Sequence, residues 1–323
     1  MHISDTYSYF EALSVRLDVQ DELFETIQNH FHRLQAGQVG EKKLRDALTD
    51  YNFTQNNYIF YDFQTVNRNG FSHQIDALLI TEFFLLVMEV KHFSGTLSYK
   101  PQVHEFSRIS HDGVVTNFKN PFDQVYRHQL FLNNYFSSLG FHLPIERIVI
   151  SSNYRAILDS SLFDFPILHL SGLPTLLEKL FQNYTNKIID VPTITAMLEQ
   201  IRTNLPIQKR VPRDRIRTGV LCVNCQLQHV MKYRRGFWHC SVCHSKSREA
   251  IFFALNHYRL LISSHITNRD FRTFFGIESS SIATKLLAQL KLDKVNNGRG
   301  SYYIIPENIL ERRNTFRNGK KEM

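Results

Sequence analysis

Two apolar segments that lie next to each other limit the possible folds most strongly. Residues 72–80 and 83–91 are rich in β-branched, aromatic and other apolar residues, at the density expected of buried strands. Only Thr81-Glu82 separates them. The pattern therefore predicts an antiparallel hairpin with a two-residue turn, placed in the core of a sheet.

Polar residues interrupt both strands of this hairpin, where a core strand is expected to be apolar. The predicted turn places Gln74 opposite Glu89 and Asp76 opposite Val87. Side chains alternate with a period of two, so four of them share one face: Gln74, Asp76, Glu89 and Lys91. Two neighbouring carboxylates are costly to bury unpaired, and a divalent cation bound by Asp76 and Glu89 would offset that cost. Oxygen ligands favour Mg²⁺ or Mn²⁺.

The motifs around this hairpin resemble the nuclease-related domain, NERD, of the PD-(D/E)xK nuclease superfamily. The resemblance covers roughly residues 36 to 150. It rests on four motifs in order: Gly40-Glu41, Gln74-Ile75-Asp76, Glu89-Val90-Lys91 followed by Gly95, and Asn120-Pro121 with Gln124. A lone Asp…Glu-x-Lys pattern occurs by chance in many chains, whereas four ordered motifs on suitable elements are more specific.

The resemblance implies an α/β (α+β) fold with a restriction-endonuclease-like mixed sheet flanked by helices. It also implies a metal-dependent nuclease that hydrolyses DNA. Asp76 and Glu89 would bind Mg²⁺ or Mn²⁺, and Lys91 would position and activate the attacking water. Three further residues complete the candidate catalytic group: Glu41, Gln74 and Gln124.

The residues alone leave other interpretations open. Glu41 lies near the start of a predicted helix over residues 38–48, where it could simply favour the helix dipole. Gln124 could be an exposed residue of a helix that starts at Asn120-Pro121. His73 and His92 flank the candidate site and are expected to be structural.

Four cysteines form two Cys-x-x-Cys pairs with fourteen residues between them. This is the spacing of a zinc ribbon, in which four thiolates bind one structural Zn²⁺. A redox dithiol pair is the alternative, and His229, His239 or His244 could replace one cysteine. The predicted ligands are Cys222, Cys225, Cys240 and Cys243.

Cations alternate with aromatic residues between the two cysteine pairs. Such a segment suits phosphate contact and base stacking, which predicts nucleic-acid contacts from Lys232, Arg234, Arg235 and Trp238. An ordinary ribbon hairpin, with Trp238 shielding the zinc, is the alternative.

The C-terminal region resembles a winged-helix domain. Helices are expected over residues 249–263, 267–276 and 281–292, followed by a basic hairpin over 294–305. In that family residues at the start of the last of these helices face the major groove and the wing also lies against DNA, although many members bind proteins instead. The implied contacts are Ser281, Thr284, Lys285 and Arg299.

Charge is distributed unevenly along the 323 residues, and residues 206–323 carry 22 Lys and Arg against 8 Asp and Glu. A basic C-terminal region favours a nucleic-acid partner, most naturally DNA. The expected divisions are a helical extension packed on the nuclease core (1–35), a NERD domain (36–204), a linker (205–218), a zinc ribbon (219–247), a winged-helix-like domain (248–310) and a basic tail (311–323).

The start of the chain lacks the pattern of a signal peptide, and the longest apolar run is too short to span a membrane. We therefore expect a cytoplasmic protein. The favoured function is a nuclease in DNA processing or repair. The alternative is a DNA-binding regulator with an inactive nuclease fold, and a further possibility is a protein partner for residues 173–203.

Overall fold

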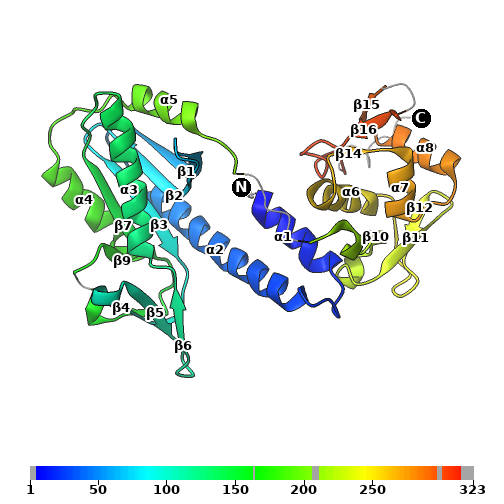
Figure 1. Cartoon of the computed structure of the whole chain (residues 1–323), viewed down its shortest axis with the longest axis horizontal. Coiled ribbons are helices and arrows are strands. Elements are labelled where there is room, and N and C mark those ends of the chain that lie inside the picture. Colours follow the sequence, from blue (N-terminus) through cyan, green and yellow to red (C-terminus); the bar gives the residue numbers. More distant parts are fainter. Residues whose placement is uncertain (1–4, 163, 206–210, 297–299, 314–323) are drawn as a thin grey trace. The chain divides into compact units, whose positions relative to one another are not determined.

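The computed structural model describes residues 5–162, 164–205, 211–296 and 300–313. The chain forms two compact units (Figure 1). One contains residues 34–206, and the other combines residues 1–33 with 207–323. None of the helices in the described ranges has the length and apolar content needed to cross a bilayer.

A five-stranded mixed sheet forms the centre of the 34–206 unit. Its order is β1-β2-β3-β7-β9. The strands are β1 (Asn57–Val66), β2 (Ser72–Thr81), β3 (Leu85–Lys91), β7 (Ile145–Ser151) and β9 (Ile167–His169). The first three pair antiparallel, and β3, β7 and β9 pair in parallel. The expected mixed sheet is confirmed.

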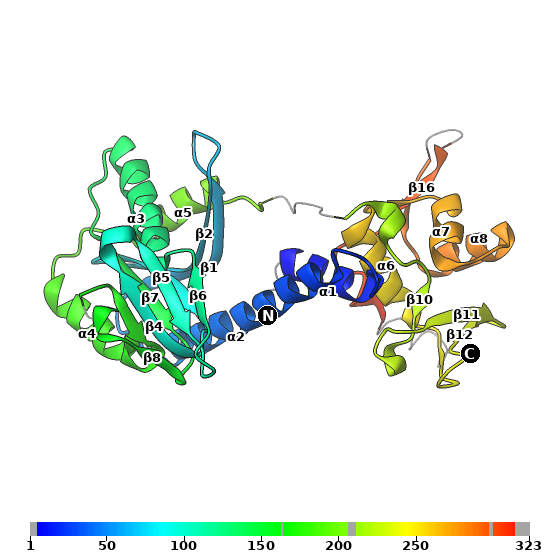
Figure 2. The ribbon, with the colours of Figure 1, turned by 60° about the horizontal axis from the view of Figure 1, so that its bottom comes forward.

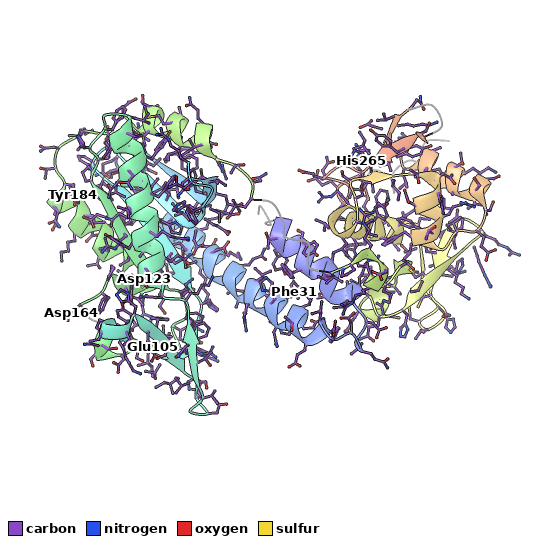
Figure 3. All side chains as sticks on the ribbon, in the orientation of Figure 1. Phe31, Glu105, Asp123, Asp164, Tyr184 and His265 are labelled. Carbon is purple, nitrogen blue, oxygen red and sulfur yellow. The ribbon has the colours of Figure 1, made fainter. Side chains whose placement is uncertain are left out.

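Helices cover both faces of this sheet, which is why its central strands are apolar on both sides (Figure 2). On one face, the apolar core includes residues of α3 (Pro121–Ser138) and α5 (Val191–Ile201). On the other face, it includes residues of α2 (Phe24–Asp50) and α4 (Leu173–Asn183). Tyr184, which follows α4, donates its hydroxyl hydrogen to Glu146 of β7 at 2.5 Å (Figure 3).

A second sheet of four strands has the order β6-β5-β4-β8. The strands are β4 (Gly95–Lys100), β5 (Glu105–Ile109), β6 (Val115–Phe118) and β8 (Ala156–Leu158). Gly95 has φ +88°, and a Cβ atom there would collide with the carbonyl oxygen of Ile109. Glycine is therefore required where the chain leaves β3 and enters this sheet.

The hairpin between β2 and β3 exists, but its predicted turn is wrong. The connection spans residues 82–84, because the Thr81 hydroxyl accepts hydrogen bonds from the amides of Phe83 (3.2 Å) and Phe84 (2.9 Å). Leu78 therefore pairs with Val87. The register moves by two residues, and an even shift by itself keeps the parity of the side chains.

The N-terminal helix α1 (Asp5–Arg16) packs on α6 (Ala250–Leu261), so it belongs to the unit that contains the C-terminal residues. The buried Arg16 side chain accounts for this placement. Its Nε donates to Nδ1 of His257 at 3.0 Å, and its Nη1 donates to the carbonyl oxygens of Arg217 (2.7 Å) and Gly219 (3.1 Å).

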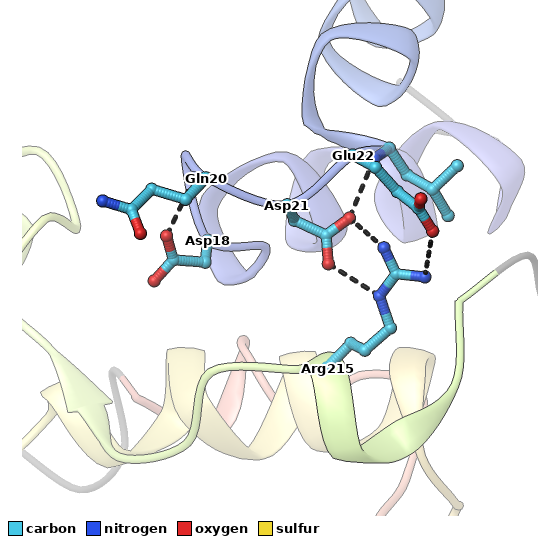
Figure 4. A network of polar contacts seen from close by, with 6 residues as sticks. Asp18, Gln20, Asp21, Glu22 and Arg215 are labelled. Atoms are coloured by element: carbon cyan, nitrogen blue, oxygen red, sulfur yellow. Dashed lines mark hydrogen bonds and ion pairs between the residues drawn. The ribbon is translucent and has the colours of Figure 1, made fainter.

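Arg215 adds an ionic contact within the same unit. Its guanidinium group binds both carboxylate oxygens of Asp21 and also contacts Glu22 (Figure 4). Asp21 and Glu22 lie in the loop between α1 and α2, so residues near 215 hold the N-terminal segment in place. The expected linker over 205–218 thus makes defined contacts where the structure describes it.

The remaining elements of this unit form two small sheets and a helical group. One sheet has the order β10-β11-β12-β13 and the other the order β14-β16-β15. The strands are β10 (Val220–Leu221), β11 (Val230–Arg234), β12 (Phe237–His239), β13 (Lys246–Ser247), β14 (His265–Ile266), β15 (Asp293–Val295) and β16 (Tyr302–Ile304). Helices α7 (Asn268–Phe275) and α8 (Ser280–Gln289) follow β14, close to the predicted positions. Short 3-10 helices occur at Pro101–Val103, Ser160–Leu162, Leu170–Gly172, Arg213–Arg215 and Val223–Cys225.

Candidate functional site

Asp76 lies where β2 and β3 separate. The ladder between the two strands ends at the pair Ala77–Met88. Beyond this pair, the Asp76 side chain replaces a backbone partner, because its Oδ2 accepts a hydrogen bond from the amide of Val90 at 2.7 Å. The carboxylate is thereby held against the end of β3, which carries Glu89.

The alternation of side chains breaks at the same level in β1 and β2. Phe60 and Phe63 both pack in the core beneath α3, as do Ile75 and Leu78, although each pair is three residues apart. In β1 the break coincides with Asp62, whose φ is +50°. Aspartate tolerates this left-handed conformation better than most residues. The two breaks lie opposite each other, since Asp62 and Asp76 fall between the pairs Tyr61–Ala77 and Phe63–Ile75.

Lys91 contacts both Glu89 and Gln124. The Lys91 ammonium group lies 2.5 Å from Oε1 of Glu89 and 3.5 Å from Oε1 of Gln124. Glu89 is only 3% exposed, and its second carboxylate oxygen, Oε2, is buried without a hydrogen-bond partner among the described residues. Such an atom is expensive to bury unless a ligand contacts it.

The electrostatics show a cluster with excess negative charge. Burial, and then the Glu89 carboxylate, raise the pKa of Asp76 well above its ordinary value. Burial likewise raises the pKa of Glu89. Burial lowers the pKa of Lys91, but the Glu89 and Asp76 carboxylates outweigh it, so the net pKa is raised. One lysine does not neutralise this cluster, and its oxygen donors suit a hard divalent cation.

Glu41 approaches the cluster from the opposite helix layer. Glu41 is exposed to solvent, but desolvation by the surrounding protein, followed by the charges of Asp62 and Glu89, raises the pKa of its carboxyl group. The helix predicted over residues 38–48 does not start there, because Gly40 and Glu41 lie inside the continuous helix α2. A Cβ atom at Gly40 would come within 2.9 Å of Oγ of Ser152, so the glycine allows α2 to approach the sheet.

Gln74 is the predicted site residue that the structure does not bring to Glu89 or Lys91. Its amide nitrogen donates to Oδ1 of Asp62 at 2.8 Å. The break in β2 accounts for this difference, since alternation no longer carries Gln74 onto the face of Asp76. Asp62 was missed. An acidic residue within the aromatic segment 58–63 is visible in the sequence, but it does not indicate where the side chain lies.

The two flanking histidines make structural contacts, as predicted. Nδ1 of His73 lies 3.1 Å from Nδ1 of His128, and Nδ1 of His92 lies 3.0 Å from Oγ of Ser152. Burial lowers the pKa of His73 to about 4 and that of His128 to about 3, so both rings are neutral near pH 7.

The four cysteines converge on one point in the second unit. Their sulfur atoms all lie within 4.8 Å of one another, with separations of 3.6 Å between Cys222 and Cys243 and 3.7 Å between Cys225 and Cys240. Four sulfurs bound tetrahedrally at about 2.3 Å from zinc would be about 3.8 Å apart. The cluster thus fits a structural zinc site. In the described part of the chain, no histidine joins it.

The ribbon hairpin exposes its cations but not its tryptophan. Lys232, Arg234 and Arg235 are exposed on and after β11. Trp238 is 1% exposed and packs in an apolar cluster with Cys222 and Cys240. The predicted stacking of Trp238 on a base is therefore wrong for this structure, and the shielding alternative fits, because the buried ring covers the cysteine cluster.

The predicted contacts in the helical group have different outcomes. Ser281, Thr284 and Lys285 are exposed on α8, with the Thr284 hydroxyl 3.0 Å from the amide nitrogen of Asn268. Arg299 lies outside the described residues.

Comparison with known proteins gives one match. The family model of the nuclease-related domain, NERD, matches residues 36–152. No match was found among curated proteins or among solved structures. The matched segment contains Glu41, Asp76, Glu89, Lys91 and Gln124. Residues 36–152 of this chain therefore form a nuclease-related domain.

Proposed function

We propose that the 34–206 unit is a metal-dependent nuclease that hydrolyses phosphodiester bonds in DNA, with Asp76 and Glu89 holding Mg²⁺ or Mn²⁺. The strongest support is the buried Oε2 atom of Glu89. It has no hydrogen-bond partner in the described chain, yet it lies in a cluster with Asp76 and Lys91. A cation between the two carboxylates would supply this missing contact.

The residues have distinct roles in this proposal. A bound cation supplies positive charge to the oxygens of the scissile phosphate. The Lys91 ammonium group positions the attacking water and stabilises negative charge that develops on the phosphate. Gln124, which accepts a hydrogen bond from Lys91, and Glu41, across the site, orient these groups.

The test is cleavage of linear and circular DNA with Mg²⁺ or Mn²⁺. We expect Asp76→Asn to lower the rate about 10³-fold or more, because several kcal/mol of stabilisation is lost with the cation. Asp123→Asn is the matched control, since Asp123 is an exposed acid at the start of α3 (Figure 3). Equal rates for wild type and Asp76→Asn would reject a nuclease and favour a DNA-binding regulator.

The C-terminal modules are proposed to hold the DNA. The proposed winged-helix assignment is supported by the order α6, β14, α7, α8, β15, β16, with β16 between β14 and β15, which resembles that of winged-helix domains. The exposed Lys285 on α8 and the exposed cations of the ribbon hairpin suit phosphate contacts. The zinc cluster would stabilise the ribbon, and its thiolates would suit the reducing conditions of the cytoplasm.

Salt dependence tests this binding role. Replacing the three ribbon cations together (Lys232→Ala, Arg234→Ala, Arg235→Ala) should weaken DNA binding and lower the slope of log K against log salt by about one unit per lost phosphate contact. An unchanged slope, measured by fluorescence anisotropy, would remove the ribbon from the DNA interface.

A further inference from the structure

A cavity of about 620 Å³ lies between α3 and the turn that joins β1 to β2. This volume is in the range of pockets that bind small organic groups. Its walls include Phe71 and Arg68 from the turn and Arg127, Phe131 and Asn134 from α3. None of the candidate catalytic residues lines it.

Flat rings form one wall of this cavity. His73 stacks on Phe131 with ring centres 4.2 Å apart and an interplanar angle of 21°. Phe131 and Tyr135 continue the series at 6.3 Å, also at 21°. Phe71 lines the cavity and is 65% exposed, so its ring is accessible to a ligand. Stacked rings beside an exposed phenylalanine suit a planar aromatic ligand.

The charges of the cavity favour an anionic ligand. Arg68 and Arg127 line it and are exposed, and neither has an ion-pair partner within the ranges that the structure describes. No aspartate or glutamate is among the lining residues. A planar ring with a negatively charged backbone, such as a nucleotide, matches both features.

The cavity adjoins the candidate catalytic cluster through α3. Gln124, Arg127, Phe131 and Asn134 follow helical spacing, so they lie along one face of the helix. The charge of Arg127 acts on Glu89. Phe131 lies seven residues beyond Gln124, which is about 10 Å along the helix axis. A nucleotide next to the scissile phosphate would reach the cavity.

We propose that this cavity receives an unstacked nucleobase that flanks the scissile phosphate, so that the substrate is a DNA strand with an unpaired nucleotide at that position. The base would insert between Phe71 and the ring wall at Phe131, with Arg68 and Arg127 beside its phosphates. This proposal rests on the proposed nuclease function.

The first experiment measures cleavage of single-stranded oligonucleotides by the full zinc-loaded chain with Mg²⁺. Each substrate carries one abasic site, placed in turn at every position around the cut. We expect one abasic position to slow cleavage about tenfold, the loss expected for one stacked base. Phe71→Ala should slow cleavage of the intact strand to a similar extent. It should not slow cleavage of that abasic strand any further. Tyr154→Ala is the control, since Tyr154 is 79% exposed and does not line the cavity.

The second experiment does not depend on cleavage. In an Asp76→Asn background without divalent cation, a strand with 2-aminopurine at successive positions should change its fluorescence on binding. Asn134→Trp, which would fill the cavity from an exposed helix position, should remove this change, and Tyr154→Ala should keep it. If no cleavage occurs but this pattern appears, the cavity assignment stands and the nuclease proposal fails. If cleavage occurs but abasic sites, Phe71→Ala and Asn134→Trp have no effect, the cavity assignment is overturned and the nuclease stands.

Discussion

Among the residues that the structure describes, Lys91 is the one cation in contact with Glu89. Its side chain is largely buried beside the carboxylate. We expect Lys91→Met to lower the cleavage rate about 10²-fold, the effect of losing one charged group that stabilises the transition state. Mn²⁺ binding should persist, because the carboxylate ligands are unchanged. Steady-state cleavage rates and a Mn²⁺ titration of the same variant test this expectation. Loss of Mn²⁺ binding in the variant would show that Lys91 organises the metal site instead.

The Arg16–His257 contact predicts a pH dependence in the other unit. Burial, and then the charge of Arg16, lower the pKa of His257 to about 3, against about 6.5 in an unfolded chain. Its stabilising contribution is therefore complete above about pH 6.5 and decreases as the pH falls toward 3. At pH 5 the loss reaches about 2 kcal/mol.

Hydrogen exchange at pH 7.5 and 5.0, corrected for intrinsic rates, measures this effect in α1 and α6. Wild type should lose protection at pH 5.0. His257→Gln should lose less, since its amide oxygen can accept the hydrogen bond of Arg16 and does not titrate. The same loss in both proteins would mean that another group controls the pH dependence.

At the residue scale, the sequence predicted that Asp76 and Glu89 lie together, because the parity of the strand pairing sets this placement. Asp76 and Glu89 stay together because the register moved by two residues, and an even shift keeps the parity of the side chains. Gln74 and Asp62 depend instead on the broken alternation at Asp62, where φ is +50°. A left-handed residue within a strand has no pattern in the sequence, so neither placement could be predicted.

At the scale of elements, Gly40 controls how closely α2 packs on the sheet. Replacing a helical glycine by alanine usually stabilises a helix by about 0.5–1 kcal/mol. We expect Gly40→Ala to destabilise the protein by about 1–3 kcal/mol instead, because its Cβ would meet Ser152 at 2.9 Å and His92 at 3.3 Å. Cleavage should also slow, since Glu41 moves with the helix.

Gly37→Ala is the matched control in the same helix. Its nearest neighbour would be Oε1 of Glu41 at 3.9 Å, an ordinary contact. This variant should therefore show the usual gain in stability. Thermal unfolding of both variants decides the point, and a gain in both would show that α2 tolerates a wider separation from the sheet.

Most elements were predictable because their signals are local. Helix α3 begins at Pro121, with Oδ1 of Asn120 accepting from the amide of Phe122, as its Asn-Pro motif suggests. The separate helix predicted over residues 38–48 did not form, because no helix boundary occurs before Gly40. Helix α2 continues through two glycines because tertiary packing, which the sequence does not display, outweighs their low helix propensity.

At the scale of the whole molecule, the zinc cluster and the helical group share one core. Cys222, Cys240 and Trp238 pack with Ile251 and Leu255 of α6. We expect Cys225→Ser or a strong chelator to loosen this core and shift the emission of Trp238, the single tryptophan of the chain, to longer wavelength. Restoring zinc should reverse the shift in wild type only. Unchanged emission after zinc removal would mean that the core holds without the metal.

The division of the chain was the least predictable feature. Residues 1–33 join the C-terminal unit through Arg16, whose partners are 201 to 241 residues away in the sequence. Such contacts have no local signature. Charge did indicate a basic C-terminal region, because composition does not depend on the path of the chain.

Mn²⁺ binding to the full zinc-loaded chain, followed by electron paramagnetic resonance, tests the central claim most directly. The account predicts one Mn²⁺ site in wild type and in Asp123→Asn, and loss of that site in both Asp76→Asn and Glu89→Gln. Mn²⁺ bound equally well by Glu89→Gln, or not bound by the wild-type chain, would contradict it.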